Sequence, residues 1–340
     1  MTIQSMNLNL SDSLADELKL LNAHILASRG IIVTGHINPD GDNIGSQLAL
    51  GEYFERIGKK YILLDEDPLP AFLRFLPNTH MIKTLSENKI NSSEYDLVIV
   101  VDSGDLPRIG GVADVFTGSM KIVNIDHHLG NTLFGDMNII HENASSIGEI
   151  LYYFFRINSI EISMDMASDL FVSIVTDTGF FRYDQTSPEV HMIAADLISR
   201  GISPNYFHIQ LNLMKSLGYT RLLSLLLSRM ELFEDSSIAF SYLLIDDFTG
   251  YSDIDTDTMI EHLGMLDTVS VYFLIKEKKP NLYGASLRSK YDVDVAKIAS
   301  VLGGGGHMRA AGCRTQEMPF DDFKDRLLGL IKDEVQAYQH

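Results

Sequence analysis

The residues His36-Ile37-Asn38-Pro39-Asp40-Gly41-Asp42-Asn43-Ile44-Gly45-Ser46 form a polar loop between two segments of different character. Before the loop, residues 31–34 form a mostly apolar run typical of a buried strand. After it, apolar residues recur at helical spacing, which predicts an amphipathic helix over residues 45–57. Strand, loop and helix in this order are typical of the first unit of a parallel α/β sheet.

Further apolar runs continue this alternation through the first half of the chain. We predict strands over residues 61–64, 97–101 and 121–125. Ser146-Ile147-Gly148-Glu149 fits a capping box, which predicts a helix from there through residue 155. Together these patterns predict an α/β fold, with an N-terminal parallel sheet covered by helices on both faces.

The second half of the chain changes from helical to strand-like patterns. Thr186-Ser187-Pro188-Glu189 predicts a helix start, and the pattern stays helical to residue 227. Strands predicted over 238–244, 269–275 and 282–287 then indicate a smaller C-terminal α+β domain. The predicted domains are residues 1–195, a helical connector over 196–235, and residues 236–340.

Composition is globular and narrows the range of partners. The 340 residues contain one cysteine, Cys313, which excludes an intramolecular disulfide framework and suits a reducing, cytoplasmic location. We expect no membrane span and no signal peptide, because the apolar runs are short and residues 1–14 lack a basic region followed by an apolar one. The net charge of −19 is poorly suited to binding long nucleic acid, so a phosphate ligand should be short.

Three of the predicted strands are followed directly by side chains that can bind a metal. In a parallel α/β sheet the carboxyl ends of the strands lie along one edge, so residues far apart in sequence meet there. A segment after a predicted helix adds one more carboxylate. The side chains expected at this edge are His36, Asp40, Asp42, Asp102, Asp126, His127, His128 and Asp177.

A cluster of this composition requires cations. Four carboxylates without a counter-charge would repel one another, and burying them would be costly. Two divalent ions would neutralise this charge. Oxygen and imidazole ligands without thiolate suit Mn²⁺ or Mg²⁺, and leave Fe²⁺, Co²⁺ and Zn²⁺ open. The four carboxylates are Asp40, Asp42, Asp102 and Asp177.

The motifs resemble, in order, those of the DHH phosphoesterases. The loop at 36–46 resembles the first motif and Val101-Asp102-Ser103-Gly104-Asp105 the second, while Asp126-His127-His128 is the motif that names the family. Thr176-Asp177-Thr178-Gly179-Phe180-Phe181-Arg182-Tyr183 resembles the fourth. Gly303-Gly304-Gly305-Gly306-His307-Met308-Arg309-Ala310-Ala311-Gly312 resembles the signature of the DHH-associated domain. The resemblance covers nearly the whole chain, and no ligand position is lost.

The resemblance implies two Mn²⁺ ions per active site, with Mg²⁺ or Co²⁺ as alternatives. The ions would share a hydroxide that attacks phosphorus in line. Asp102 would bridge the two ions. One ion would be held by His36, Asp40 and Asp102, and the other by Asp42, Asp102, His127 and Asp177.

The resemblance also implies catalytic and substrate-binding residues. Asp126 would orient a neighbouring ligand, and His128 would contact the scissile phosphate and assist the leaving oxygen. Glycines let backbone N–H groups approach an anion closely, which suits the glycine run for phosphate binding. The expected substrate contacts are Arg108, Arg182, Arg288, Gly305, Gly306 and His307.

Within the family, the resemblance points to the group that acts on short RNA fragments and on adenosine 3′,5′-bisphosphate (pAp). Such an enzyme would release 5′-mononucleotides from RNA fragments, remove the 3′-phosphate of pAp, and form a homodimer. A phosphodiesterase for cyclic di-AMP or linear pApA is the alternative within the family. An inorganic pyrophosphatase ranks lower, because the glycine–histidine signature and Arg288 suit a nucleotide. A non-catalytic nucleotide-binding protein is the alternative from another class.

Overall fold

The computed structural model describes residues 11–251, 254, 256, 258–315 and 317–338, apart from the side chains of residues 307 and 338. They form two compact units, Met1–Met214 and Lys215–His340. The division falls inside the connector predicted over 196–235, whose extent stays a prediction. In the part of the chain described, no helix has both the length and the apolar character needed to cross a bilayer.

The N-terminal unit contains a six-stranded sheet with the order β3-β2-β1-β4-β5-β6, in which every pair is parallel. The chain leaves β1 for β2 on one side and then returns to β4 on the other. This reversal between β1 and β4 is where α/β sheets bind ligands. The strands are β1 (Ile31–Thr34), β2 (Tyr61–Asp65), β3 (Ile82–Thr84), β4 (Leu97–Val101), β5 (Lys121–Asp126) and β6 (Met137–Ile140).

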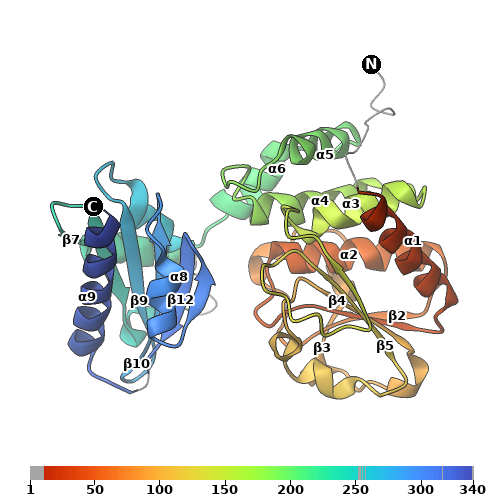
Figure 1. The fold of residues 1–340 in the computed structure, drawn as a ribbon, viewed down its shortest axis with the longest axis horizontal. Coiled ribbons are helices and arrows are strands. Elements are labelled where there is room, and N and C mark those ends of the chain that lie inside the picture. The colour runs from red at the N-terminus through yellow and green to blue at the C-terminus, as the bar shows by residue number, and fades with distance from the viewer. Residues whose placement is uncertain (1–10, 252–253, 255, 257, 316, 339–340) are drawn as a thin grey trace. The chain divides into compact units, whose positions relative to one another are not determined.

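The two faces of this sheet pack differently. Figure 1 shows α2, α3 and α4 stacked on one side, where Val33, Ile99 and Val123 enter the larger core. Alternate residues such as Ile32 and Val98 face the short helix η6 (Leu106–Val115) on the other side. The helices are α1 (Asp12–Ala27), α2 (Gly41–Arg56), α3 (Ile147–Ile157), α4 (Met164–Asp177), α5 (Pro188–Ser199) and α6 (Pro204–His208).

Helix α2 begins earlier than the hydrophobic pattern indicates. Its first residue is Gly41 instead of residue 45, because the Asp40 carboxylate accepts hydrogen bonds from the backbone N–H groups of Asp42 and Asn43. The helix therefore carries Asp42 in its first turn. The motif at residues 36–46 is therefore part loop and part helix.

The C-terminal unit contains a second six-stranded sheet, with the order β11-β12-β10-β9-β8-β7. Only β8 and β9 pair in parallel. Helices α8 and α9 cover one face, whereas α7 and the 3-10 helix η9 cover part of the other. The elements are α7 (Leu217–Ser228), β7 (Glu231–Phe233), β8 (Ile238–Leu243), η9 (Met259–Met265), β9 (Val271–Lys279), β10 (Leu282–Ser289), α8 (Val295–Val301), β11 (Gly305–His307), β12 (Ala310–Arg314) and α9 (Phe320–Tyr338).

The predicted fold class is confirmed: an α/β unit with a parallel sheet precedes a smaller α+β unit. Every strand predicted from an apolar run is present. The pattern missed β3, β6, β7, β11 and β12 because they are short edge strands or consist largely of glycine and alanine, which give little hydrophobic signal.

Helices α2 and α4 pack closely at Gly45, where no side chain separates their backbones. A Cβ added to Gly45 would lie 2.4 Å from the carbonyl oxygen of Asp169, a backbone atom that cannot turn away. We expect Gly45→Ala to destabilise the N-terminal unit by about 1–3 kcal/mol, the usual cost of overpacking. Gly329→Ala in α9 is the control, because nothing lies within 4 Å of its added Cβ. Urea unfolding should show the control unchanged or stabilised by about 1 kcal/mol, and equal effects of both would contradict this packing.

The Asp169 side chain lies in the same interface, fully buried, with no hydrogen-bond partner for either carboxylate oxygen among the described residues. Burial, followed by the charges of Glu52 and Asp165, raises its pKa well above the ordinary value. The folded state therefore favours the protonated form. Its stabilising contribution is complete below the unfolded-state pKa of about 3.9 and is lost as the pH rises towards the folded-state pKa.

We therefore expect Asp169→Asn to flatten the pH dependence of stability. The free energy of unfolding of the parent protein should fall more steeply than that of the variant as the pH rises above about 4. Asp16→Asn, at an exposed position of α1, is the control and should keep the parent slope. Identical slopes for parent and Asp169→Asn would show that this carboxyl group does not set the pH dependence.

Candidate metal centre

The loops that follow β1, β4 and β5 and the last turn of α4 bring the predicted ligands together. His36 Nε2 lies 3.2 Å from Asp102 Oδ2 and 3.8 Å from Asp40 Oδ2. One oxygen or nitrogen from each of these three residues lies within 4.8 Å of the others. A single cation could therefore be bound by His36, Asp40 and Asp102.

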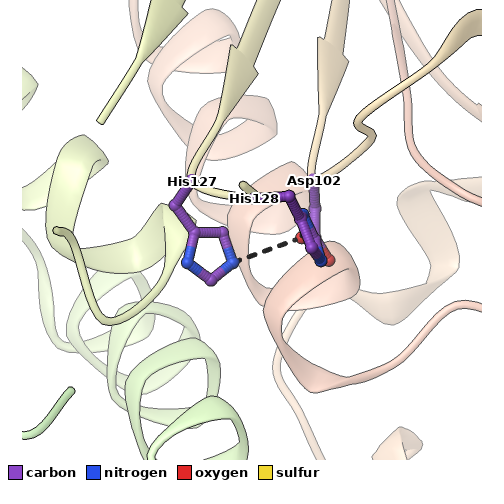
Figure 2. Close-up of side chains that lie close together, drawn as sticks. All are labelled: Asp102, His127 and His128. Carbon is purple, nitrogen blue, oxygen red and sulfur yellow. Dashed lines mark ion pairs between the residues drawn. The ribbon is translucent and has the colours of Figure 1, made fainter. Parts of the chain in front are cut away.

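The second group surrounds His127. Its Nε2 lies 3.3 Å from Asp177 Oδ2 and 3.6 Å from both Asp42 Oδ2 and Asp102 Oδ1. Figure 2 shows the ion pair between His127 and Asp102, with His128 beside it. The Nε2 atom is buried and has no hydrogen-bond partner among the described residues. A nitrogen surrounded by three carboxylates but bonded to none of them fits a site for a divalent cation.

The tautomers of both histidines suit this purpose. His36 Nδ1 lies 2.8 Å from the carbonyl oxygen of Ile37, and His127 Nδ1 lies 3.1 Å from that of Ala144. Each carbonyl fixes a proton on Nδ1, so Nε2 is the nitrogen available to a metal.

Asp42 is held by the N-terminus of α3. Its carboxylate accepts hydrogen bonds from the backbone N–H of Ile147, at 2.9 Å, and of Gly148, at 3.3 Å, and from the hydroxyl of Ser173. The partial positive charge of a helix N-terminus favours an anion there. Sequence analysis missed these contacts, although the capping box at residue 146 marks the helix start that makes them.

Without a bound cation, the carboxylates of the cluster favour protonated imidazoles. Burial disfavours the charged imidazoles, but interactions with the nearby carboxylates, Asp102 foremost, outweigh it and raise the pKa of His36 and of His127 to about 11. Burial and the charge of Asp102 raise the pKa of Asp42 to about 7. Burial, followed by the charge of Asp42, raises the pKa of Asp177 well above its ordinary value. A divalent cation would displace these protons, so its affinity should increase with pH.

Backbone strain marks the same location. Asp102 has φ of 56° at the end of β4, a left-handed conformation that is unfavourable for a residue other than glycine. Gly179, Phe180 and Phe181 also have positive φ, immediately after Asp177. Phe181 stacks on His191 with a centroid separation of 5.1 Å, which anchors this turn. Such strain concentrates at functional sites.

Asp126 and His128 form a pair beside the cluster. Asp126 Oδ1 lies 2.8 Å from His128 Nδ1, and Asp126 Oδ2 accepts a hydrogen bond of 2.6 Å from Asn131. Burial opposes ionisation of Asp126, but the hydrogen bond from His128 outweighs it and lowers its pKa. Asn131 also donates to Asn124, which joins the loops after β4 and β5. Neither asparagine was singled out from the sequence.

A run of acidic residues after β2 supports the loop that carries His36. Asp65 accepts a hydrogen bond from the backbone N–H of Gly35, and Asp67 accepts one of 2.7 Å from that of Asn38. Gln47 donates to both oxygens of Asp65. The sequence carried a usable signal, because these carboxylates also follow a predicted strand.

The predicted substrate contacts are divided between the two units. Arg108 is exposed at the start of η6, and its carbonyl accepts a hydrogen bond from Ile37. Arg182 is exposed and donates to the carbonyl of Gly179 within its own turn. Arg288, in the other unit, pairs with Glu261 at 3.3 Å. The side chain of His307 lies outside the described residues.

The glycines of the run at residues 303–306 have different surroundings. Added Cβ atoms on Gly304 and Gly306 would lie 2.2 Å and 2.5 Å from carbonyl oxygens of β12, so these glycines allow close packing. Gly305 has nothing within 4 Å of its added Cβ, and it lines an open cavity. Of Gly305 and Gly306, only Gly305 has open space beside it.

A doubly wound parallel sheet with a carboxylate and imidazole cluster at its reversal point defines a metal-binding α/β protein. Residues 30–174 match the model of the DHH family, N-terminal domain, and residues 235–337 match that of the DHHA1 domain. The chain belongs to the DHH family of phosphoesterases, metal-dependent hydrolases that act on phosphoester bonds.

Known proteins resemble the chain over most of its length. It is 28% identical over 324 residues to the bifunctional oligoribonuclease and PAP phosphatase NrnA of Thermus thermophilus, which covers 94% of this chain and 95% of that protein. It is 24% identical over 327 residues to the cyclic-di-AMP phosphodiesterase PdeA of Listeria monocytogenes, but spans 48% of that protein. The crystal structure of an exopolyphosphatase-related protein from Bacteroides fragilis shares the fold, with a TM-score of 0.89, 22% identity, and coverage of 96% of this chain and 98% of that one.

Asp102 belongs to the group with His36 and Asp40, and its Oδ1 also lies 3.6 Å from Nε2 of His127 in the other group. We expect Asp102→Ala to abolish binding of Mn²⁺ at both positions and to lower phosphoesterase activity by more than about a hundredfold, because even residues that only orient a metal ligand contribute about 10–100-fold. Asp105→Ala is the control, since Asp105 caps η6. Metal content measured by mass spectrometry, together with hydrolysis of a generic phosphodiester, checks this. Full metal content and near-normal turnover in Asp102→Ala would contradict the bridging role.

Proposed function

We propose that this protein hydrolyses short RNA oligonucleotides to 5′-mononucleotides and removes the 3′-phosphate of pAp. The support is the near-complete overlap with the Thermus NrnA protein, which has both activities in its name and is matched across 95% of its length. The matched length leaves no room in that relative for a large further domain. The acidic chain, with a net charge of −19, suits short phosphate ligands better than long ones.

The observation that supports the chemistry most strongly is the orphaned Nε2 of His127 among three carboxylates. We propose two divalent ions, Mn²⁺ or alternatively Mg²⁺ or Co²⁺, since the donors are imidazoles and carboxylates without thiolate. Such ions, when bound, stabilise charge on phosphoryl oxygens and increase the acidity of an attacking water. The proposed ligands are His36, Asp40 and Asp102 for one ion, and Asp42, Asp102, His127 and Asp177 for the other.

The remaining residues act on the substrate. Asp126 holds His128 through Nδ1, so His128 Nε2 is assigned to the scissile phosphate and to the proton of the leaving oxygen. In the C-terminal unit we assign anion binding to Gly305 and Gly306, with Arg288 and His307 beside them. Arg108 and Arg182 are assigned to the phosphate as exposed guanidinium groups.

A cytoplasmic location and a homodimer complete the proposal. The single cysteine, Cys313, is buried and free, as suits a reducing compartment. The oligomeric state can be measured directly by light scattering after size-exclusion chromatography.

A second candidate function is hydrolysis of cyclic di-AMP or linear pApA. The match to the Listeria phosphodiesterase supports it, since 90% of this chain is covered. It ranks second because the chain spans only half of that protein, whereas it spans almost all of the Thermus protein.

A competition assay with Mn²⁺ distinguishes these functions. Equal amounts of di- to pentaribonucleotides, pAp, linear pApA, cyclic di-AMP and pyrophosphate are offered together, and the products are separated by chromatography. We expect the RNA oligomers and pAp to be consumed first. Preferential loss of cyclic di-AMP or pApA would replace the leading function with the second one. Metal-loaded protein that is inert on every substrate would indicate a binding protein.

A further inference from the structure

The C-terminal sheet has an open region that no role above explains. Along β10, Tyr283, Ala285 and Leu287 enter the core beneath α8 and α9. Because side chains alternate along a strand, Gly284, Ser286 and Arg288 face the opposite side. Among the described residues, helix α7 and η9 cover that side near β8 and β9. Towards β12 and β11 it is hollowed into a cavity of about 420 Å³.

Three cationic side chains and several glycines line this cavity. Lys276 and Lys278 come from β9, and Arg314 comes from β12. Gly284 pairs with Lys276 on one side and with Arg314 on the other. Because Gly284 has no side chain, no side chain of β10 lies between Lys276 and Arg314 at this point of the sheet. Gly303 and Gly305, the unobstructed glycines of the run, line the same cavity.

Lys276 is the unusual member of this group. Only 7% of it is exposed, and its Nζ donates a hydrogen bond of 3.2 Å to the hydroxyl of Thr256. Its charge therefore lies at the wall of the cavity. Lys278 and Arg314 are exposed at the same wall.

The charge distribution along the chain supports an anion as the ligand. Residues 215–340 contain 14 Lys and Arg against 19 Asp and Glu, so the strongly acidic balance belongs mainly to the N-terminal unit. The cationic cavity is therefore set in the less acidic unit. Its lining, two lysines and an arginine with exposed backbone at glycine, is the chemistry that recognises a phosphate group.

We propose that Lys276, Lys278 and Arg314 bind a further phosphate of an oligonucleotide, beyond the nucleotide held near Arg288. This inference rests on the proposed function and adds the determinant of substrate length. Arg288 and Gly284 are four residues apart on β10, about 13 Å at roughly 3.4 Å per residue. A single phosphate cannot reach both ends of this distance, and the two phosphates of pAp, joined through one ribose, are too close together to span it. A ligand that uses both ends therefore contains two or more nucleotides.

The test compares the Lys278→Gln/Arg314→Gln double variant with the parent protein on pAp and on 5′-phosphorylated di-, tri- and pentaribonucleotides. We expect kcat/KM for the tri- and pentanucleotides to fall about tenfold or more, with the loss in KM, because these contacts are made equally in the ground state. Activity on pAp should stay within about twofold. Fluorescence anisotropy in EDTA should show the same loss of affinity for a labelled pentanucleotide, independent of turnover.

Lys279→Gln is the matched control, because it removes the same charge from the same strand outside the cavity lining. Equal loss on pAp and pentanucleotide, or no loss on either, would overturn the inference. If the parent protein itself cleaves no oligonucleotide, the proposed function fails instead.

Discussion

Crowded, buried carboxylates at one edge of a sheet require cations, and the N-terminal unit is organised around that requirement. Asp42, Asp102 and Asp177 approach His127 Nε2 to 3.3–3.6 Å without a hydrogen bond being formed. Without a cation, the carboxylates raise the pKa of His36 and of His127, and the charged imidazoles that this favours would offset the negative charge. Divalent ions would do so more completely and would give the cluster its chemistry.

Several features of the fold position the side chains of this cluster. Reversal of strand order between β1 and β4 places the loops that carry His36 and Asp102 side by side. The N-terminus of α3 stabilises Asp42 through backbone N–H groups, and close packing of α2 on α4 at Gly45 aligns Asp42 with Asp177. Asp102 has a left-handed backbone conformation, which lowers the stability of the fold but sets the geometry of the site.

Much of this arrangement was predictable, since strand ends and polar residues coincide in the sequence. The parallel sheet followed from apolar runs, and the clustering of His36 with Asp102 followed from the rule that carboxyl ends share an edge.

What could not be predicted depends on contacts between residues that are far apart in the sequence. The hydrogen bonds of Asn131 to Asp126 and of Asp67 to Asn38 involve residue types that are common in any turn. The glycine run was predicted as an anion loop, yet Gly304 and Gly306 are needed for packing on β12, whereas Gly303 and Gly305 have open space beside them.

The two units provide different kinds of binding group. The acidic unit concentrates carboxylates for cations, whereas the C-terminal unit presents lysine, arginine and glycine for anions. The central claim is that the first of these is a two-cation centre, and anomalous diffraction at the manganese edge from crystals soaked in Mn²⁺ tests it most directly. The account predicts two peaks, one among His36, Asp40 and Asp102 and one among Asp42, Asp102, His127 and Asp177. No peak at this edge of the sheet, or peaks only elsewhere, would contradict it.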